Sequence, residues 1–190
     1  MVISDFNCPY CYTLNEWIFE LGASSRVRWV GIEHRPELPF SGENKISDRQ
    51  TLTAEVNDVR SRAPEVAVSH PAAWINSHQA LLYQNALEDD DPEHAPIIRR
   101  KIFQAYWQKG QLISQEHIIQ EMFHKHGLSL PEVEPDYLEE LSIWWKENLD
   151  RIPCMIAPTG VAHLGLQDKR AVQSFLNSAL RETPAGPGCL

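Results

Sequence analysis

The stretch Cys8-Pro-Tyr-Cys11 constrains the fold of this chain more than any other feature of its sequence. The residues before it, 1–5, read as a short strand, and a helix is predicted to begin at Pro9. The helical prediction comes from apolar residues at i, i+3, i+4 and i+7, which are Leu14, Trp17, Ile18 and Leu21. In residues 27–34 apolar and polar side chains alternate, which predicts a second strand. The chain therefore opens with a β-α-β unit that carries two cysteines at its first turn.

The rest of the chain changes character twice. A helical block follows a loop rich in Pro and Gly, and its predicted helices are roughly 48–62, 77–88, 93–109, 115–126 and 136–149. A predicted hairpin of strands 153–157 and 161–164 and a helix at 169–180 come last. This β-α-β, helices, β-β-α order is that of the thioredoxin fold, an α/β fold with one mixed sheet. We expect one domain over 1–190, with an all-helical insertion at about 45–135 and a flexible tail at about 183–190.

The composition argues against a nucleic-acid-binding protein, a membrane protein and a scaffold built on disulfides. The chain has 190 residues, 43% of them hydrophobic, a net charge of -9 and a pI near 5.3. The acidic balance argues against nucleic acid as a partner. No apolar run reaches the ~20 residues that span a bilayer, and the first residues do not read as a signal peptide, so we expect no membrane association and a cytoplasmic location. Four cysteines do not suggest a scaffold built on disulfides.

The position of Cys8 predicts a reactive thiol. Pro9 is tolerated at the first position of a helix, which makes Cys8 the N-cap residue. A thiolate there accepts hydrogen bonds from free amides and feels the positive end of the helix dipole, so we expect a lowered pKa and an ionised Cys8 near neutrality. Cys11 lies one turn on and is expected to be more buried.

A metal site and inert thiols are the alternatives for this pair. Zinc needs about four ligands, and the other two cysteines, Cys154 and Cys189, stand alone in the sequence. His124 and His126 are two residues apart and point away from each other on a helix. The strand-then-helix setting favours dithiol redox chemistry without a metal.

Pro153, near the end of the chain, is expected to lie close to the cysteine pair. The stretch "RIPCMIA" places Pro153 at the entrance of a late strand, where a missing N–H costs no ladder hydrogen bond. In a thioredoxin fold this position carries a cis-proline beside the cysteine pair and leaves the backbone of the preceding residue, Ile152, to pair with an extended substrate. A trans proline that only ends the preceding helix is the alternative.

With these residues in view, the chain resembles the DsbA-like thioredoxin-fold oxidoreductases. Within them it is similar to the FrnE-like branch, which is related to 2-hydroxychromene-2-carboxylate isomerases and kappa-class glutathione transferases. The resemblance covers nearly the whole chain. It rests on "SDFNCPYC", on "AYWQKGQLISQEHIIQEMFHKHGL" and on "IPCMIAPTGVAHLGLQ".

The resemblance implies thiol-disulfide exchange with Cys8 as nucleophile, Cys11 as resolving cysteine and Pro153 as the cis-proline. The dipeptide between the cysteines is Pro-Tyr, as in glutaredoxins, which leaves the redox potential open. Cys154 follows the proline where the family often has Thr or another small residue. It reads either as a small buried hydrophobe or as a third redox-active thiol.

Other residues near the motif have candidate roles. Asp5 is a candidate proton acceptor for Cys11, or else it caps and hydrogen-bonds locally. Phe6 and Tyr10 are candidates for an apolar rim that binds substrate, together with Ile152 and Pro153.

The leading hypothesis is a dithiol-disulfide oxidoreductase for disulfide-containing proteins or small thiols, with no cofactor and with glutathione open as a co-substrate. A glutathione-dependent isomerase or transferase is the second hypothesis, although such enzymes usually have a serine at the position of Cys8. A non-catalytic module that holds extended chains is the third. The physiological substrate, the direction of electron flow and the oligomeric state stay open.

Overall fold

A four-stranded mixed sheet forms the centre of the protein. The computed structural model describes residues 1–133 and 135–181, so Cys189 and the predicted tail lie outside the described residues. The strands are β1 (Val2–Ser4), β2 (Trp29–Gly31), β3 (Cys154–Ile156) and β4 (Ala162–Leu164), in the spatial order β2-β1-β3-β4. β1 pairs parallel with β2 and antiparallel with β3, which pairs antiparallel with β4. The predicted fold class is confirmed.

The helices fall close to their predicted ranges. They are α1 (Pro9–Glu20), α2 (Ile46–Arg62), α3 (His78–Asp90), α4 (Ala95–Trp107), α5 (Glu116–Lys125), α6 (Pro135–Asn148) and α7 (Lys169–Arg181), and a short 3-10 turn, η1 (Ser24–Arg26), was not expected. The second strand is shorter than predicted, three residues in place of eight. Each residue of β2 pairs with one residue of β1, and because β1 is only three residues long, β2 is limited to three residues as well.

Local chemistry sets the limits of α1. The helix starts at Pro9, and the residue before it, Cys8, has the extended backbone of an N-cap residue. It ends after Glu20, where Leu21 is the C-cap and Gly22 has a φ of 65°, a conformation that favours glycine. α1 therefore presents its N-terminus directly at the end of β1.

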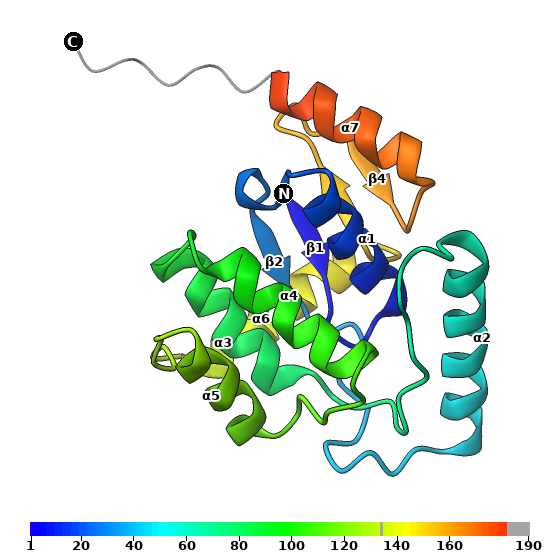
Figure 1. Ribbon diagram of the computed structural model, residues 1–190, viewed down its shortest axis with the longest axis vertical. Helices are drawn as coiled ribbons and strands as arrows, with labels where there is room; N and C mark the ends of the chain where they lie inside the picture. Colours follow the sequence, from blue (N-terminus) through cyan, green and yellow to red (C-terminus); the bar gives the residue numbers. More distant parts are fainter. Residues whose placement is uncertain (134, 182–190) are drawn as a thin grey trace.

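The helices between β2 and β3 surround the opening unit. α2 stands to one side of α1 and is joined to the rest by long loops, while α3, α4 and α5 form a group beside β2 and α1 (Figure 1). Trp17, Trp74 and Trp107 are among the largest fully buried side chains and belong to the core. None of the described helices is both long and apolar enough to cross a bilayer.

Candidate active site

Cys8 and Cys11 lie at the N-terminus of α1, at the carboxyl end of the central strand β1. The register of β1 with β3 pairs Ile3 with Cys154, so the antiparallel chain just before β3 runs beside this end of β1. The Ile152–Pro153 peptide bond in that segment is cis. The topology thus gathers at one edge of the sheet the two cysteines and the Ile152–Pro153 segment that the sequence singled out.

Both thiols are buried in this conformation. Cys8 is 5% exposed and Cys11 is 1% exposed, and the two side chains are hydrogen-bonded to each other. Burial raises the pKa of Cys8, and the contact with Cys11 and the nearby Glu55 carboxylate act in the same direction. The Cys11 amide, which hydrogen-bonds to Cys8, favours the thiolate but does not outweigh burial. The expectation of a lowered pKa and an ionised Cys8 is therefore wrong.

Asp5 is fully buried and holds the turn that precedes the cysteines. Its carboxylate accepts hydrogen bonds from the amides of Asn7 (3.2 Å) and His34 (2.8 Å) and from the Ser77 hydroxyl. Burial raises the pKa of Asp5 to about 6, although these three hydrogen bonds oppose the shift. Asp5 does hydrogen-bond locally, as one of its two predicted roles required. The role of proton acceptor stays a prediction.

The two aromatic residues of the predicted rim differ in position. Phe6 is 0% exposed, with its ring centroid 5.1 Å from that of Trp29 and 4.7 Å from that of Phe103. Phe6 is therefore a core residue and not part of a surface rim, because its side chain follows the inward face of the turn. Tyr10 is half-buried and its hydroxyl group is hydrogen-bonded to Asp58 of α2, and burial raises its pKa.

Two tryptophans hold the backbone just before Cys8. The indole N–H of Trp107, on α4, donates to the carbonyl of Phe6 (2.8 Å), and that of Trp74 donates to the carbonyl of Asn7 (2.7 Å). No local pattern in the sequence points to these two hydrogen bonds, because each joins an indole to a carbonyl more than sixty residues away. The helical insertion thus fixes the approach of the chain to Cys8.

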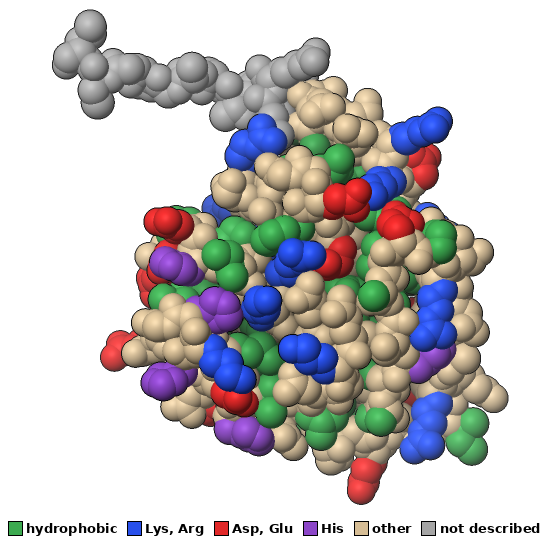
Figure 2. Space-filling model, in the orientation of Figure 1, with side chains coloured by type: hydrophobic (Ala, Val, Ile, Leu, Met, Phe, Trp, Pro, Cys, Tyr) green, Lys and Arg blue, Asp and Glu red, His purple; other side chains and the backbone are tan. Residues whose placement is uncertain are grey.

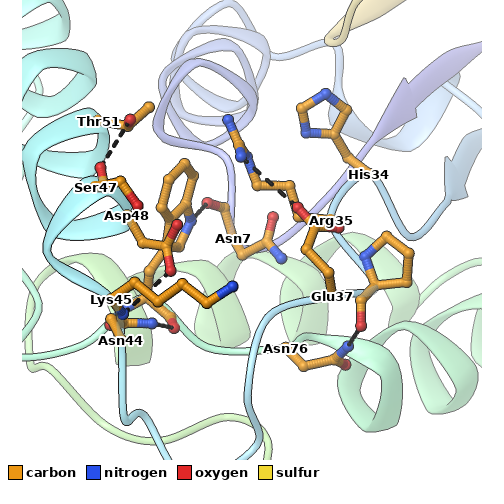
Figure 3. A network of polar contacts seen from close by, with 12 residues as sticks. Asn7, His34, Arg35, Glu37, Asn44, Lys45, Ser47, Asp48, Thr51 and Asn76 are labelled. Carbon is orange, nitrogen blue, oxygen red and sulfur yellow. Dashed lines mark hydrogen bonds and ion pairs between the residues drawn. The ribbon is translucent and has the colours of Figure 1, made fainter.

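A polar network lies beside this backbone. The Arg35 guanidinium carbon sits 4.2 Å from the ring centroid of Trp74, and its terminal nitrogens lie 3.8 Å from Glu37 and 3.7 Å from Glu55. Figure 3 shows Asn7 in the middle of this network, with Lys45 and Asp48 on one side and Arg35 and Glu37 on the other. Residues after β2 and at the start of α2 therefore border the segment that leads to Cys8.

Cys154, the alternative of a metal site and the cavities of the protein complete the description of the site. Cys154 is fully buried in β3, and burial raises the pKa of its thiol. Within residues 1–133 and 135–181, no three His, Cys, Asp or Glu side chains come together as a group able to hold a metal ion. Two cavities, of about 440 Å³ between β4 and α7 and about 310 Å³ between α4 and α5, include neither cysteine of the pair.

Comparisons with known proteins agree with this geometry. A structure from Nitrosomonas europaea described as a "putative protein disulfide isomerase" superposes with a TM-score of 0.70 at 12% identity, covering 95% of this chain and 96% of that one. A "probable DsbA oxidoreductase" from Streptomyces coelicolor gives a TM-score of 0.68 at 11% identity, covering 97% and 90%. These likenesses show the fold. No curated protein sequence matched the chain.

The family model named DSBA-like thioredoxin domain matches residues 1–141, which include the cysteine pair and helices α1 to α5. The match spans well over half of the chain. The chain therefore belongs to the DSBA-like thioredoxin domain family of oxidoreductases.

Proposed function

We propose that the protein exchanges thiols and disulfides with its substrates through Cys8 and Cys11. The observation that carries the proposal is the hydrogen bond between the two thiols at the N-terminus of α1. Two sulfurs in such contact can be joined by a disulfide with little movement of the backbone. The Ile152–Pro153 segment beside them supplies a place for an extended substrate.

The exchange balances as two displacements at sulfur. The Cys8 thiol loses its proton and its sulfur attacks one sulfur of a substrate disulfide, which breaks the S–S bond and releases the other half as a thiol once it takes up a proton. Cys11 then loses its proton and attacks Cys8, which breaks the mixed disulfide and releases the second thiol. Two electrons pass to the substrate and a Cys8–Cys11 disulfide forms. The reverse sequence oxidises a dithiol substrate.

Burial supports an order of attack and implies that the site must open for the proposed reaction. Cys8 is the less buried of the two thiols and Cys11 follows it on the next turn, which suits Cys8 to the first step and Cys11 to the second. Because Cys8 is only 5% exposed, the contacts around it, among them that of Tyr10 with Asp58, loosen before a substrate sulfur arrives. Asp5, with a pKa of about 6, is the proposed proton acceptor for Cys11.

The proposed substrates are disulfide-containing proteins or small thiol compounds, with glutathione as a co-substrate. No metal or organic cofactor enters the proposed reaction, because the cysteines themselves carry the electrons. The cytoplasm is the proposed location.

Cysteine variants test the proposal. Insulin reduction, followed as turbidity in the presence of dithiothreitol, should fall to the uncatalysed rate in Cys8→Ser. Cys11→Ser should instead accumulate a mixed disulfide on Cys8, detectable by mass spectrometry, because the second displacement is lost. Cys154→Ser is the matched control and should keep the wild-type rate. Unchanged turnover in Cys8→Ser would refute dithiol exchange. Binding of glutathione without thiol exchange, together with activity that survives Cys11→Ala, would favour the glutathione-dependent isomerase or transferase.

A further inference from the structure

The cavity of about 310 Å³ between α4 and α5 lies outside the site described above, since neither cysteine of the pair lines it. Its volume falls within the ~300–1,000 Å³ typical of pockets for small molecules. Lys101, Lys109 and Lys125 line it, and among its described lining residues Glu121 supplies the only carboxylate. The chain as a whole has a net charge of -9, yet Figure 2 shows Lys, Arg and His side chains gathered on this face. The lining of the cavity is therefore positive in an acidic protein.

The three lysines are accessible, and two of them are unpaired. All three residues are exposed, so a solute can reach them from water. Lys125 faces Glu121 at 2.6 Å on the same helix. Lys101 and Lys109 form no ion pair and no side-chain hydrogen bond with any residue in the described part of the chain. The ammonium groups of these two lysines are therefore free to bind an anion.

The end of α4 does not need these cations as caps. Lysines near the C-terminus of a helix often bind its last carbonyls and interact with its dipole. In α4 the backbone already does this, because the Gln111 N–H donates to the Ala105 carbonyl (2.9 Å). The Gly110 N–H likewise donates to the Tyr106 carbonyl (3.1 Å). Lys101 lies in the middle of α4, away from either end. Support of the helix end therefore does not account for the lysines of the cavity.

The cavity also has an apolar part. Ala105 of α4 and Ile118 and Met122 of α5 contribute to its lining. Ile118 and Met122 are four residues apart and so lie on the same face of α5. Both are only half-buried, which leaves apolar surface open to a ligand. Methionine, with three rotatable bonds, adapts its shape to what it contacts. A molecule that fills the cavity thus meets cations and apolar side chains together.

The chemistry of the lining matches a phosphate ester. Lysine binds phosphate as a point charge, whereas paired recognition of a carboxylate usually uses arginine, and no arginine is among the described lining residues. A phosphate monoester carries a charge of about -1.5 to -2 at pH 7, which suits three lysines opposed by one glutamate. We propose that the cavity between α4 and α5 binds a small phosphate monoester with a compact apolar group. This site is independent of the dithiol and of the exchange activity proposed above.

Phenyl phosphate is the probe, and two simpler anions dissect its binding. Inorganic phosphate has the charge without the ring, and benzenesulfonate has the ring with a single charge. Isothermal titration calorimetry of the full chain is carried out at low salt and at pH 8, about two units above the second pKa of a phosphate monoester. We expect phenyl phosphate to bind at one site and about tenfold more tightly than either of the other anions, because it alone satisfies both the lysines and the apolar surface.

Variants of exposed residues locate the binding site without disturbing the core. Lys101→Gln and Lys109→Gln should each weaken the binding of phenyl phosphate by about fivefold, the upper range for an exposed ion pair. Glu121→Gln should strengthen it severalfold, because it removes the carboxylate that competes for Lys125. Lys146→Gln is the matched control, since Lys146 is exposed on α6 and does not line the cavity. It should bind phenyl phosphate as the wild type does.

Each outcome bears on the proposal in one direction. Weaker binding in both lysine variants and tighter binding in Glu121→Gln, with Lys146→Gln unchanged, supports the site. No binding of phenyl phosphate, equal affinity for the three anions, or an equal loss in Lys146→Gln would overturn it, the last by showing attraction to the overall charge only. Vesicles that contain phosphatidic acid separate a lipid headgroup from a soluble ester, and binding to them but not to phenyl phosphate would also overturn it. None of these results depends on the insulin assay.

Discussion

At the scale of single residues, the site is governed by burial. Cys8 occupies the N-cap position that the sequence indicated, yet its pKa is raised because it is enclosed by its surroundings. The helix N-terminus favours a thiolate only when the sulfur is also exposed to water or to a positive charge. The proposed exchange therefore requires the contacts that bury Cys8 to loosen before its sulfur can meet a substrate.

The raised pKa of Asp5 makes the free energy of unfolding depend on pH in a specific way. Its pKa rises from 3.8 to about 6 on folding, so the folded state holds the proton more tightly than the unfolded chain. The stability that this proton contributes is fully present below pH ~4 and is lost as the pH rises through 6, by up to about 3 kcal/mol.

Urea unfolding at a series of pH values measures this effect. Between pH 4 and pH 8, the free energy of unfolding of wild type minus that of Asp5→Asn should fall by up to about 3 kcal/mol. Asp150→Asn, at an exposed position, is the control and should show no such trend. A difference that stays flat or rises with pH would show that the carboxyl of Asp5 does not titrate as described.

At the scale of elements, the helical insertion does more than cover the sheet. α4 supplies the Trp107 indole that holds the Phe6 carbonyl, and the loop before α3 supplies Trp74 for the Asn7 carbonyl. The cysteine turn is thereby attached to segments that lie more than sixty residues away in the sequence. The position of the dithiol depends on the insertion as well as on α1.

The Trp107 hydrogen bond can be isolated by comparing two tryptophans. Trp107→Phe leaves the Phe6 carbonyl without its partner, which costs roughly 1–3 kcal/mol beyond the loss of ring volume. Trp29→Phe is the matched control, because the Trp29 indole is buried and its N–H has no hydrogen-bond partner in the described chain. Chemical denaturation should show Trp107→Phe to be the less stable variant. Equal stability would remove the proposed importance of this bond.

The sequence predicted elements better than it predicted contacts. Apolar periodicity and turn residues predicted the helices α1 to α7 of the described chain, and Pro9 with Gly22 placed both ends of α1. Phe6 was misplaced because the direction of a side chain in a turn depends on what packs over it, here Trp29 and Phe103. The contacts of Trp74 with Asn7 and Arg35 could not be predicted from local sequence patterns, since they are a hydrogen bond and a ring contact between distant segments.

At the scale of the whole molecule, charge is unevenly distributed. The net charge is -9, yet Lys, Arg and His side chains gather on the face formed by α4 and α5 (Figure 2). Lys101, Lys109 and Lys125 line the cavity between these two helices, with His126. The dithiol has a different setting, since acidic groups such as Glu55 lie near it and oppose the formation of a thiolate. The cavity between α4 and α5 includes neither Cys8 nor Cys11, so the basic residues that line it are separate from the cysteine pair.

The proposed function requires that Cys8 and Cys11 form one redox couple. The direct measurement is an equilibrium titration of the protein in glutathione buffers of graded composition, with the state of each cysteine read by alkylation and mass spectrometry. We expect a single two-electron transition, in which Cys8 and Cys11 lose their free thiols together and form a disulfide with each other. Two thiols that stay reduced throughout, or that become glutathionylated independently, would contradict it.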